Sequence, residues 1–415
     1  MEIAITPPIH RRFAVSLFSR LRTAKGQANP FPIYAELRSG GGVVAAPWGG
    51  HLVTRFDLCD QVLRSREWLE PDARWREEQG DGTRWTAPSS REMSRTLPAL
   101  NPPDHTWMRR SAGMFDRASL EELRGTVDLI TSRLLDSLAE QLQGGEADFN
   151  ALVSEELPVA AIGHWLGLPT ADFPRLRDLT HDQVFTQELL PSASQLAKSD
   201  VATAELRTYF MELVRHRRAH PGDDPVSRWI TVWDGMESDR EKADEAVYFL
   251  ALFVLLAALE TTSTLLSTMT LLLLEHPRQW DRLTVHPDLV PAAVEESLRY
   301  DPPTHVISRV SSRDCVLGGV EVLKDEMVHL MVGAANRDPA KHADPELFNL
   351  HRKPAHLAFS GGIHYCLGAP LARLEAQTLL HHLVRRFPRL TLVRRPSWAP
   401  RVAFRRLLNL DVTLS

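Results

Sequence analysis

Near its carboxyl end the chain reads Phe359-Ser360-Gly361-Gly362-Ile363-His364-Tyr365-Cys366-Leu367-Gly368, and a helical pattern follows over residues 369–386. Small residues around the cysteine let the backbone approach something flat and large. The helix points its N-terminal amide groups back at the sulfur, and these groups favour the thiolate over the thiol. Cys366 is therefore a candidate ligand for a soft metal. A short Cys-x-Gly alone is more often a structural cysteine in a tight turn, so the rest of the chain has to decide.

Length, charge and cysteine content narrow the class of protein. The 415 residues suffice for one large domain or two ordinary ones, and the formal net charge is −5. The chain has no basic block with interleaved aromatic residues, so we do not expect nucleic-acid binding. Cys59, Cys315 and Cys366 are too few and odd in number for a disulfide framework. This indicates a reducing compartment, and we expect a cytoplasmic protein.

The first residues are basic from His10 to Arg22, and Glu2 is the only acidic residue before Glu36. An apolar run of about 7–15 residues, which a secretory signal needs, does not follow. We therefore expect residues 1–28 to form a loosely ordered, solvated arm, and the chain 1–415 to form a single domain.

Residues 248–274 are nearly all apolar, and this run is longer than the roughly 20 residues that a membrane span needs. Glu260 and a series of hydroxyl residues interrupt it. A carboxylate in the middle of a lipid-facing helix costs roughly 2–4 kcal/mol. No second span accompanies the run, so we expect the central rod of a large core and no membrane insertion.

Hydrophobic periodicity predicts a mainly α protein with a minor β portion. Helices are expected over 32–37, 56–63, 120–142, 239–275 and 289–300, several times within 151–220, and after Cys366. Strands are expected over 43–46 and 51–54 as a hairpin, and over 306–310, 316–322, 327–332 and 401–414. Residues 70–104 and 335–358 show little periodicity and are expected to be irregular.

The full run from Ala358 to Arg373 resembles the cytochrome P450 haem-thiolate monooxygenases, most closely their soluble bacterial branch. The resemblance implies the cytochrome P450 fold, with the long helix over the haem. It implies haem b (heme, iron protoporphyrin IX) as the cofactor and Cys366 as the metal ligand. Phe359, His364 and Gly368 belong to the same haem-binding loop by resemblance. Ser360 replaces a common glycine, which is a mild departure.

A second match is Glu295-Glu296-Ser297-Leu298-Arg299. Glu296 and Arg299 lie three residues apart on one helix face and can pair. Alone, such a pair is more typical of a solvated face. The resemblance adds Arg352 as a third member and implies a structural role, bracing the loop that carries Cys366.

A third match, Ala257-Ala258-Leu259-Glu260-Thr261-Thr262, places an acid and an alcohol inside the apolar run. The plainer alternative is that Thr261 bonds back to its own helix and Glu260 reaches a buried partner. The resemblance implies that Glu260 and Thr261 are catalytic and deliver the protons that dioxygen activation consumes. It also places Ala257 beside the haem. Ala258 stands where relatives usually have glycine, which puts the efficiency of coupling in question.

A fourth match surrounds His105 and Arg109, which lie four residues apart at a helix start. Arginine is well suited to planar carboxylates, and haem carries two propionates. The resemblance implies that both residues bind the propionates, together with Arg309 and His364. The alternative for any single one is a surface ion pair worth about 0–1 kcal/mol.

The segment from Ala334 to Phe359 also matches the family's approach to the haem loop, and we assign no chemistry to His356. Upstream, Val322 to Glu326 stands where relatives have a turn containing proline and glycine. Asp325 tolerates a left-handed backbone better than most residues, so a turn is still expected there.

Other functions compete with this interpretation. A zinc site is improbable, because Cys366 has no second cysteine at ligand spacing. A cysteine nucleophile needs a base, for which His364 is the candidate. A non-catalytic haem carrier or sensor needs no proton relay, and peroxide-driven relatives generally lack the acid–alcohol pair. Glu260 and Thr261 therefore favour an enzyme that uses dioxygen.

We expect a monooxygenase that inserts one oxygen atom from O2 into a small organic substrate, with hydroxylation in secondary-metabolite or antibiotic biosynthesis as the default. Epoxidation, oxidative coupling and a carrier-bound substrate stay open. Electrons are expected from NAD(P)H through a separate ferredoxin and ferredoxin reductase, with Arg110 as a candidate docking residue. The segments 70–104 and 171–200 are expected to line the substrate pocket. Individual pocket candidates are Trp85, Ala258, Val306, Ile307 and Phe404, although Trp85 is more readily explained by packing of its own loop.

Overall fold

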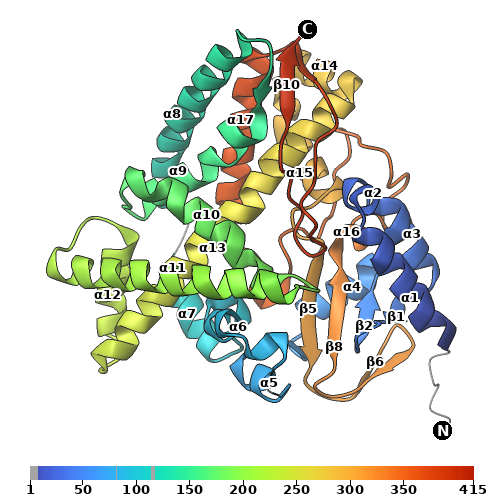
Figure 1. The fold of residues 1–415 in the computed structure, drawn as a ribbon, viewed down its shortest axis with the longest axis vertical. Coiled ribbons are helices and arrows are strands. Elements are labelled where there is room, and N and C mark those ends of the chain that lie inside the picture. The colour runs from blue at the N-terminus through green and yellow to red at the C-terminus, as the bar shows by residue number, and fades with distance from the viewer. Residues whose placement is uncertain (1–7, 81, 114–116) are drawn as a thin grey trace. The chain divides into compact units, whose positions relative to one another are not determined.

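The computed structural model describes residues 8–80, 82–113 and 117–415 (Figure 1). The chain divides into two compact units. The sheet unit consists of Met1–Glu70, Thr268–Cys366 and Arg394–Leu410. The helical unit consists of Pro71–Ser267, Leu367–Val393 and Asp411–Ser415. The expectation of a single domain over 1–415 stays a prediction.

The sheet unit is built on a five-stranded sheet with the order β1-β2-β8-β5-β3. β1 (Val43–Ala45) and β2 (His51–Val53) form the predicted hairpin. β2 runs parallel to β8 (Met327–Met331), and β8 pairs antiparallel with β5 (Val306–Ser311). β3 (Trp68–Leu69) closes the far edge against β5. β8 is buried along its whole length, as expected for a strand covered on both faces.

The single strand predicted over 316–322 is in fact a short hairpin of β6 (Cys315–Leu317) and β7 (Val320–Val322). Gly318 and Gly319 both have positive φ, 58° and 85°, and this two-residue turn folds the segment back on itself. The turn expected at Asp325 is confirmed, with φ of 63°.

The same unit also contains several helices. They are α1 (Pro8–Leu21), α2 (Ala24–Ala28), α3 (Phe31–Ser39), α4 (Phe56–Arg64), α14 (Pro277–Val285), α15 (Val290–Tyr300) and α16 (Val332–Ala335), with 3-10 turns η6 (Pro287–Leu289) and η7 (Gly362–His364). The predicted helices at 32–37, 56–63 and 289–300 are confirmed. The core joins β-branched residues of the strands to α4, and it includes Val53, Val328 and Val62.

The prediction of a loosely ordered arm is wrong for residues 8–28. α1 buries Ala14, Leu17, Phe18 and Leu21, which recur at helical spacing, and α2 follows it directly. The basic residues of this segment suggested that it is solvated, and Arg12 and Arg20 are indeed exposed, but the helix also has the buried face just described. Residues 1–7 lie outside the described part of the chain.

The helical unit holds most of the remaining helices. They are α5 (Ala73–Glu77), α6 (Pro88–Met93), α7 (Asp104–Ala112), α8 (Arg117–Leu142), α9 (Glu156–Trp165), α10 (Phe173–Gln183), α11 (Ala193–Ala219), α12 (Pro225–Asp234) and α17 (Ala369–Arg386), with 3-10 turns η1 (Arg84–Thr86), η2 (Leu97–Ala99), η4 (Thr170–Asp172) and η5 (Val184–Gln187) and the π-helical turn η3 (Asn150–Ser154). Residues 70–104 therefore form short helices where an irregular segment was expected.

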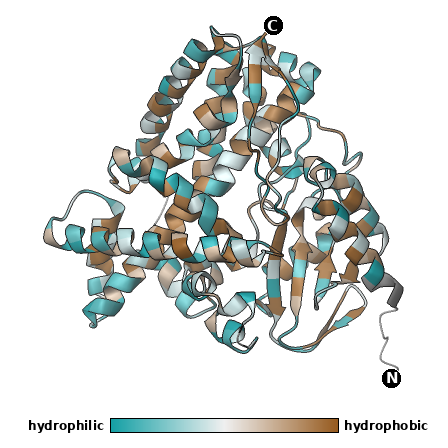
Figure 2. Ribbon diagram, in the orientation of Figure 1, coloured by the Kyte–Doolittle hydropathy of each residue, from teal (hydrophilic) through white to brown (hydrophobic). Residues whose placement is uncertain are grey.

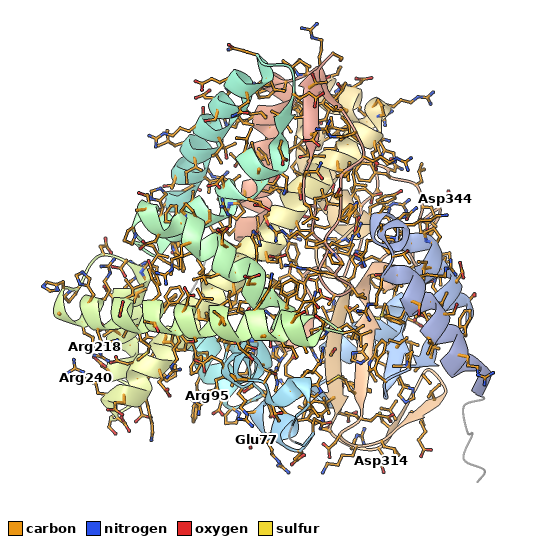
Figure 3. All side chains as sticks on the ribbon, viewed as in Figure 1. Glu77, Arg95, Arg218, Arg240, Asp314 and Asp344 are labelled. Carbon is orange, nitrogen blue, oxygen red and sulfur yellow. The ribbon has the colours of Figure 1, made fainter. Side chains whose placement is uncertain are left out.

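A small sheet with the order β4-β10-β9 also belongs to the helical unit. Its strands are β4 (Ala147–Asp148), β9 (Leu390–Leu392) and β10 (Asp411–Leu414). The strand predicted over 401–414 is thus limited to β10, and β9 was not predicted. α17 lies beside α8, and His382 Nε2 is 2.7 Å from Asp128 Oδ1 across this contact (Figure 1). Arg218 on α11, labelled in Figure 3, pairs with Asp234 on α12 at 2.7 Å.

α13 (Arg240–Glu275) is the long apolar rod, and its bounds match the prediction closely. Among the described residues it is one helix that is long and apolar enough to cross a membrane, judged by length and composition only. Figure 2 shows its hydrophobic residues in brown. Of its most apolar stretch, 78% is buried, as expected for a core helix.

Candidate active site

Cys366 is half-buried and lies in the loop that follows the turn η7. Its backbone N–H donates to Phe359 O at 3.0 Å, and its thiol is in no disulfide. Cys59 differs, because it is fully buried on α4 and burial raises the pKa of its thiol well above the usual range. Gly368 is the N-cap residue of α17, two residues after Cys366 in the chain. Of these two cysteines, Cys366 is the one placed to act as a thiolate ligand.

Two glycines of the loop lie against α4, while the predicted approach of the loop to a flat group stays a prediction. Gly362 has φ of 61°, and a Cβ there would lie 2.5 Å from Leu63 O on α4. At Gly361 a Cβ would lie 3.2 Å from Leu63 Cβ. These two glycines therefore let the loop pack closely on α4, so their close approach is to protein. Ser360 also has positive φ, 59°, which is a region that glycine adopts without strain.

Two predicted propionate ligands of the sheet unit meet at one carboxylate. Arg309 on β5 is buried, and its Nη1 lies 2.6 Å from Glu70 Oε1. His364 Nε2 lies 3.8 Å from the same oxygen. Sequence reasoning missed Glu70. The signal was its position directly after β3, because the antiparallel pairing of Leu69 with Val310 brings Glu70 level with Arg309.

The other two predicted propionate ligands belong to the helical unit. His105 and Arg109 lie one turn apart on α7, with His105 buried and Arg109 half-buried. Burial, followed by the nearby charge of Arg109, lowers the pKa of His105 below its ordinary value. A neutral imidazole donates through one nitrogen and accepts through the other. The propionate role of both residues stays a prediction.

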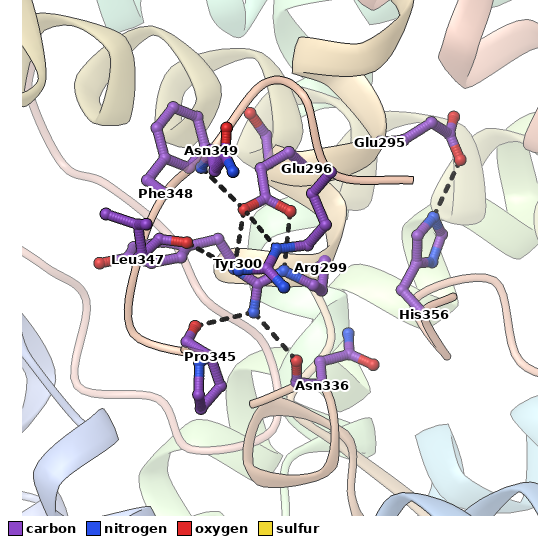
Figure 4. A network of polar contacts seen from close by, with 12 residues as sticks. Glu295, Glu296, Arg299, Tyr300, Asn336, Pro345, Leu347, Phe348, Asn349 and His356 are labelled. Atoms are coloured by element: carbon purple, nitrogen blue, oxygen red, sulfur yellow. Dashed lines mark hydrogen bonds and ion pairs between the residues drawn. The ribbon is translucent and has the colours of Figure 1, made fainter. Parts of the chain in front are cut away.

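The predicted brace is present in the sheet unit (Figure 4). Arg299 and Glu296 form two hydrogen bonds, at 2.8 and 2.9 Å, and both side chains are fully buried. Arg352 Nε lies 3.4 Å from Glu296 Oε1, so the third member is where the resemblance put it. The guanidinium group of Arg299 also donates to three carbonyl oxygens. Its Nη1 donates to those of Asn336 and Pro345, and its Nη2 to that of Leu347.

A short path joins this brace to the cysteine loop. Arg299 donates to Asn336 O at 3.2 Å, and the side chain of Asn336 accepts from Leu357 N at 2.9 Å. Leu357 O in turn accepts from Ser360 N at 2.9 Å, at the start of the loop. His356, to which no chemistry was assigned, pairs with Glu295 at 3.0 Å (Figure 4). These contacts fix the entry of the chain into the Cys366 loop.

The acid–alcohol pair on α13 shows both features of the plainer alternative. Thr261 Oγ1 donates to Ala257 O at 2.8 Å. Glu260 is buried, and its Oε2 lies 2.8 Å from His181 Nδ1 on α10. Sequence reasoning expected a buried partner for Glu260 but did not name it, because the sequence gives no register between α10 and α13.

The same stretch also contains the accessible residues of the central part of α13. Between residues 246 and 273 every residue is buried except Phe253, Ala257, Ala258 and Thr261. Phe253, Ala257 and Thr261 follow one another at intervals of four, so they share one face of the helix. A small accessible patch with a hydroxyl therefore lies on an otherwise buried rod, next to the buried carboxylate of Glu260.

The substrate candidates fall into separate groups. In the sheet unit, Phe404 pairs with Thr304 in an isolated β-bridge, just before Val306 and Ile307 on β5. In the helical unit, the ring of Trp85 packs edge-on against Trp75 at 5.2 Å, with the Arg84 guanidinium 4.0 Å from its centroid. This packing is the alternative that was weighed for Trp85. A pocket role for these residues stays a prediction.

A groove of about 520 Å³ lies on the helical unit, between α5, α7 and α12. Trp107, Trp233, Arg74 and Arg95 contribute to its lining. Most of its lining comes from the segment 70–104, which was predicted to line the substrate pocket, but none of the individual pocket candidates lies in it. The location of the substrate pocket stays a prediction.

Comparison with known proteins decides the family. The family model for cytochrome P450 matches residues 192–396. Nocardicin C N-oxygenase of Nocardia uniformis subsp. tsuyamanensis is 34% identical over 378 residues, covering 89% of this chain and 91% of the relative. The chain belongs to the cytochrome P450 family. It is a monooxygenase of the oxidoreductase class, and the predicted P450 fold is confirmed.

Other P450 proteins resemble the chain over nearly its whole length. The polyketide biosynthesis cytochrome P450 PksS of Bacillus subtilis (strain 168) is 29% identical over 400 residues, covering 93% of this chain and 96% of the relative. A crystal structure of P450BioI in complex with an acyl carrier protein ligated to hexadec-9Z-enoic acid superposes with a TM-score of 0.85. It is 30% identical and covers 94% of this chain and 99% of the other.

The residues present fit the haem that P450 proteins use. Among the described residues no group of three or more His, Cys, Asp or Glu could hold a metal ion by itself. A porphyrin supplies four nitrogen donors, so one thiolate such as that of Cys366 is sufficient from the protein. Arg309 and His364 already gather at a carboxylate, which is the chemical group of a propionate.

Proposed function

We propose that this P450 inserts one atom of O2 into a small organic substrate of secondary metabolism, by hydroxylation in the first instance. The names of similar proteins support the metabolic setting, because one is a nocardicin C N-oxygenase and another acts in polyketide biosynthesis. We place the reaction in the cytoplasm, with electrons passing from NAD(P)H through a ferredoxin reductase and a ferredoxin. Arg110 is exposed on α7 and is our candidate contact for an acidic ferredoxin.

One observation carries the proposal: the open patch of α13 combines an accessible hydroxyl with a buried carboxylate. Monooxygenation consumes two protons, and a site that excludes water must deliver them through side chains. Thr261 Oγ1 already donates to Ala257 O, so its lone pairs are left to accept a proton-bearing partner. Glu260 is the adjacent residue on the helix, and its buried carboxylate is our candidate for the group that passes protons to Thr261.

The cofactor assignments follow from family membership and the fit of the residues. We assign Cys366 as the iron ligand, and His105, Arg109, Arg309 and His364 as partners of the propionates. Bound haem supplies the chemistry of oxygen activation, while the chain orients the substrate and manages protons. The brace of Glu296 and Arg299 holds the cysteine loop in the geometry that this binding requires.

A carrier-bound substrate is the second candidate. The superposition on P450BioI supports it, because that protein is described in complex with an acyl carrier protein. The free and the carrier-bound substrate are distinguished by titrating the ferric protein with the same acyl chain, once free and once linked to the carrier. The spin-state shift measures binding in each titration. Stronger binding of the carrier-linked form by tenfold or more favours the second candidate.

Thr261→Ala tests the proposed proton delivery. A substrate is first found by screening for ligands that shift the spin state of the ferric protein. Surrogate redox partners then supply the electrons for turnover. We expect the variant to bind haem normally but to release most reducing equivalents as hydrogen peroxide, with product formation reduced about tenfold or more. Thr262→Ala, one position along the same helix and buried, is the matched control and should couple normally. Unchanged coupling in Thr261→Ala contradicts the proposed route. In the parent protein, product must carry label from ¹⁸O2.

A further inference from the structure

Glu260 is one end of a short row of titratable side chains inside the helical unit. His181 Nδ1 on α10 lies 2.8 Å from Glu260 Oε2. On the other side of the ring, His181 Nε2 lies 3.8 Å from Glu155 Oε1. The exposed fractions of the three side chains rise from 3% at Glu260 through 11% at His181 to 15% at Glu155. The row therefore leads from the buried acid of α13 towards solvent.

A local irregularity of the backbone places Glu155 at the end of this row. The π-helical turn η3 (Asn150–Ser154) precedes it, and Glu155 N donates to Asn150 O at 3.0 Å. The side chain of Asn150 also donates to Glu155 Oε1 at 3.2 Å, which fixes the carboxylate. The next residue, Glu156, pairs with Arg177 instead. π-helical turns occur frequently at functional sites, because the extra residue redirects the side chains that follow.

The chemistry of the middle residue is what distinguishes this row from a static ion pair. Lysine or arginine would also balance the charge of Glu260. Histidine alone can bind a proton at one ring nitrogen and release another proton from the second nitrogen at physiological pH. Its two nitrogens here face two different carboxylates, one buried and one closer to solvent.

We propose that His181 relays protons from Glu155 to Glu260, an inference that rests on the proposed function of the Glu260–Thr261 pair. In each transfer His181 Nε2 gains a proton from the Glu155 carboxyl group, and the proton on Nδ1 passes to Glu260 Oε2. No electron moves, and the ring stays neutral overall. Rotation of the ring then turns the protonated nitrogen towards Glu260 and the bare nitrogen towards Glu155, and solvent returns a proton to Glu155. The 3.8 Å separation is spanned by one bridging water or by a small approach of the two side chains.

A variant that keeps the charge but cannot release a proton tests the relay. His181→Arg places a cation beside Glu260 that can pair with it, yet a guanidinium does not deprotonate in proteins. We expect normal folding and haem content, product formation reduced about tenfold or more, and peroxide release that rises to match. His382→Arg is the matched control, because His382 forms the same kind of pair with Asp128 on the far side of the unit. It should behave as the parent protein does.

A second measurement does not depend on turnover. Histidine-selective NMR of the ferric protein reports the titration of the His181 ring. Loss of a neighbouring anion lowers the pKa of a histidine, so Glu155→Gln and Glu260→Gln should each lower the pKa of His181 by about half a unit or more. The titration of His382 should not change. A His181 titration that Glu155→Gln leaves unaltered overturns the relay.

The outcomes separate this inference from the function on which it rests. If His181→Arg couples normally while Thr261→Ala diverts electrons to peroxide, the relay through His181 is wrong and the monooxygenase mechanism stands. If both variants couple normally, the proposed role of the acid–alcohol pair fails as well. Impaired coupling in both, with the pKa shifts above, supports the relay.

Discussion

At the scale of single residues, Glu375 is the most unusual carboxyl group of the helical unit. It is fully buried on α17, and within the described part of the chain its Oε2 has no hydrogen-bond partner. Burial raises its pKa to about 8. The folded protein therefore holds a proton between pH 4.5 and 8 that the unfolded chain has released.

The stability of the protein should therefore depend on pH. The free energy of unfolding falls as pH rises from 4.5 to 8, with a contribution from Glu375 of up to about 1.4 kcal/mol for each pH unit. Glu375→Gln mimics the neutral carboxyl group and should remove this slope. Denaturant unfolding at a series of pH values measures it, and a slope that is the same in the variant contradicts the assignment.

The sequence alone was enough to select candidate residues whose predicted role depends on their type and spacing, such as Cys366 and the Glu260–Thr261 pair. It did not identify Glu70, His181 or Glu155. Each of these acquires its neighbour through the packing of elements that are distant in sequence, so a single sequence carries little sign of the contact. The neutral state of Glu375 was invisible for the same reason, because it depends on what covers the side chain.

At the scale of elements, the brace between α15 and the segment 336–352 should contribute strongly to stability. Glu296→Gln leaves Arg299 buried without its countercharge, and breaking such a pair costs roughly 3–5 kcal/mol. Glu36→Gln breaks an exposed pair with Arg20, for which about 0–1 kcal/mol is expected. Denaturant unfolding of the two variants compares them directly. Equal, small losses would show that the brace does not hold the segment.

The elements themselves were predicted with uneven success, for identifiable reasons. Long periodic segments such as α8, α13 and α17 were found because their burial pattern repeats over many turns. The prediction of a solvated arm failed at α1, because the segment is rich in basic residues and its buried face consists of only four side chains. The short helices of 70–104 bury few side chains each, so the hydrophobic periodicity does not extend over enough residues to predict a helix.

At the scale of the whole molecule, the fold followed from the combination of motifs more than from the helices. Many mainly α proteins share the predicted pattern of elements. The cysteine loop, the Glu–Arg brace and the acid–alcohol pair together resemble the cytochrome P450 family, and the comparisons confirm that family. The substrate could not be predicted, because it depends on the shape of a pocket lined by side chains from several segments.

The central claim is that Cys366 is the thiolate ligand of an oxygen-activating haem. The carbon monoxide difference spectrum of the reduced, purified protein tests it most directly. We predict the long-wavelength Soret band of a thiolate-ligated haem, its loss in Cys366→Ala, and its retention in Cys315→Ala, which changes a half-buried cysteine of β6. A colourless protein, or a long-wavelength band that survives Cys366→Ala, would contradict the account.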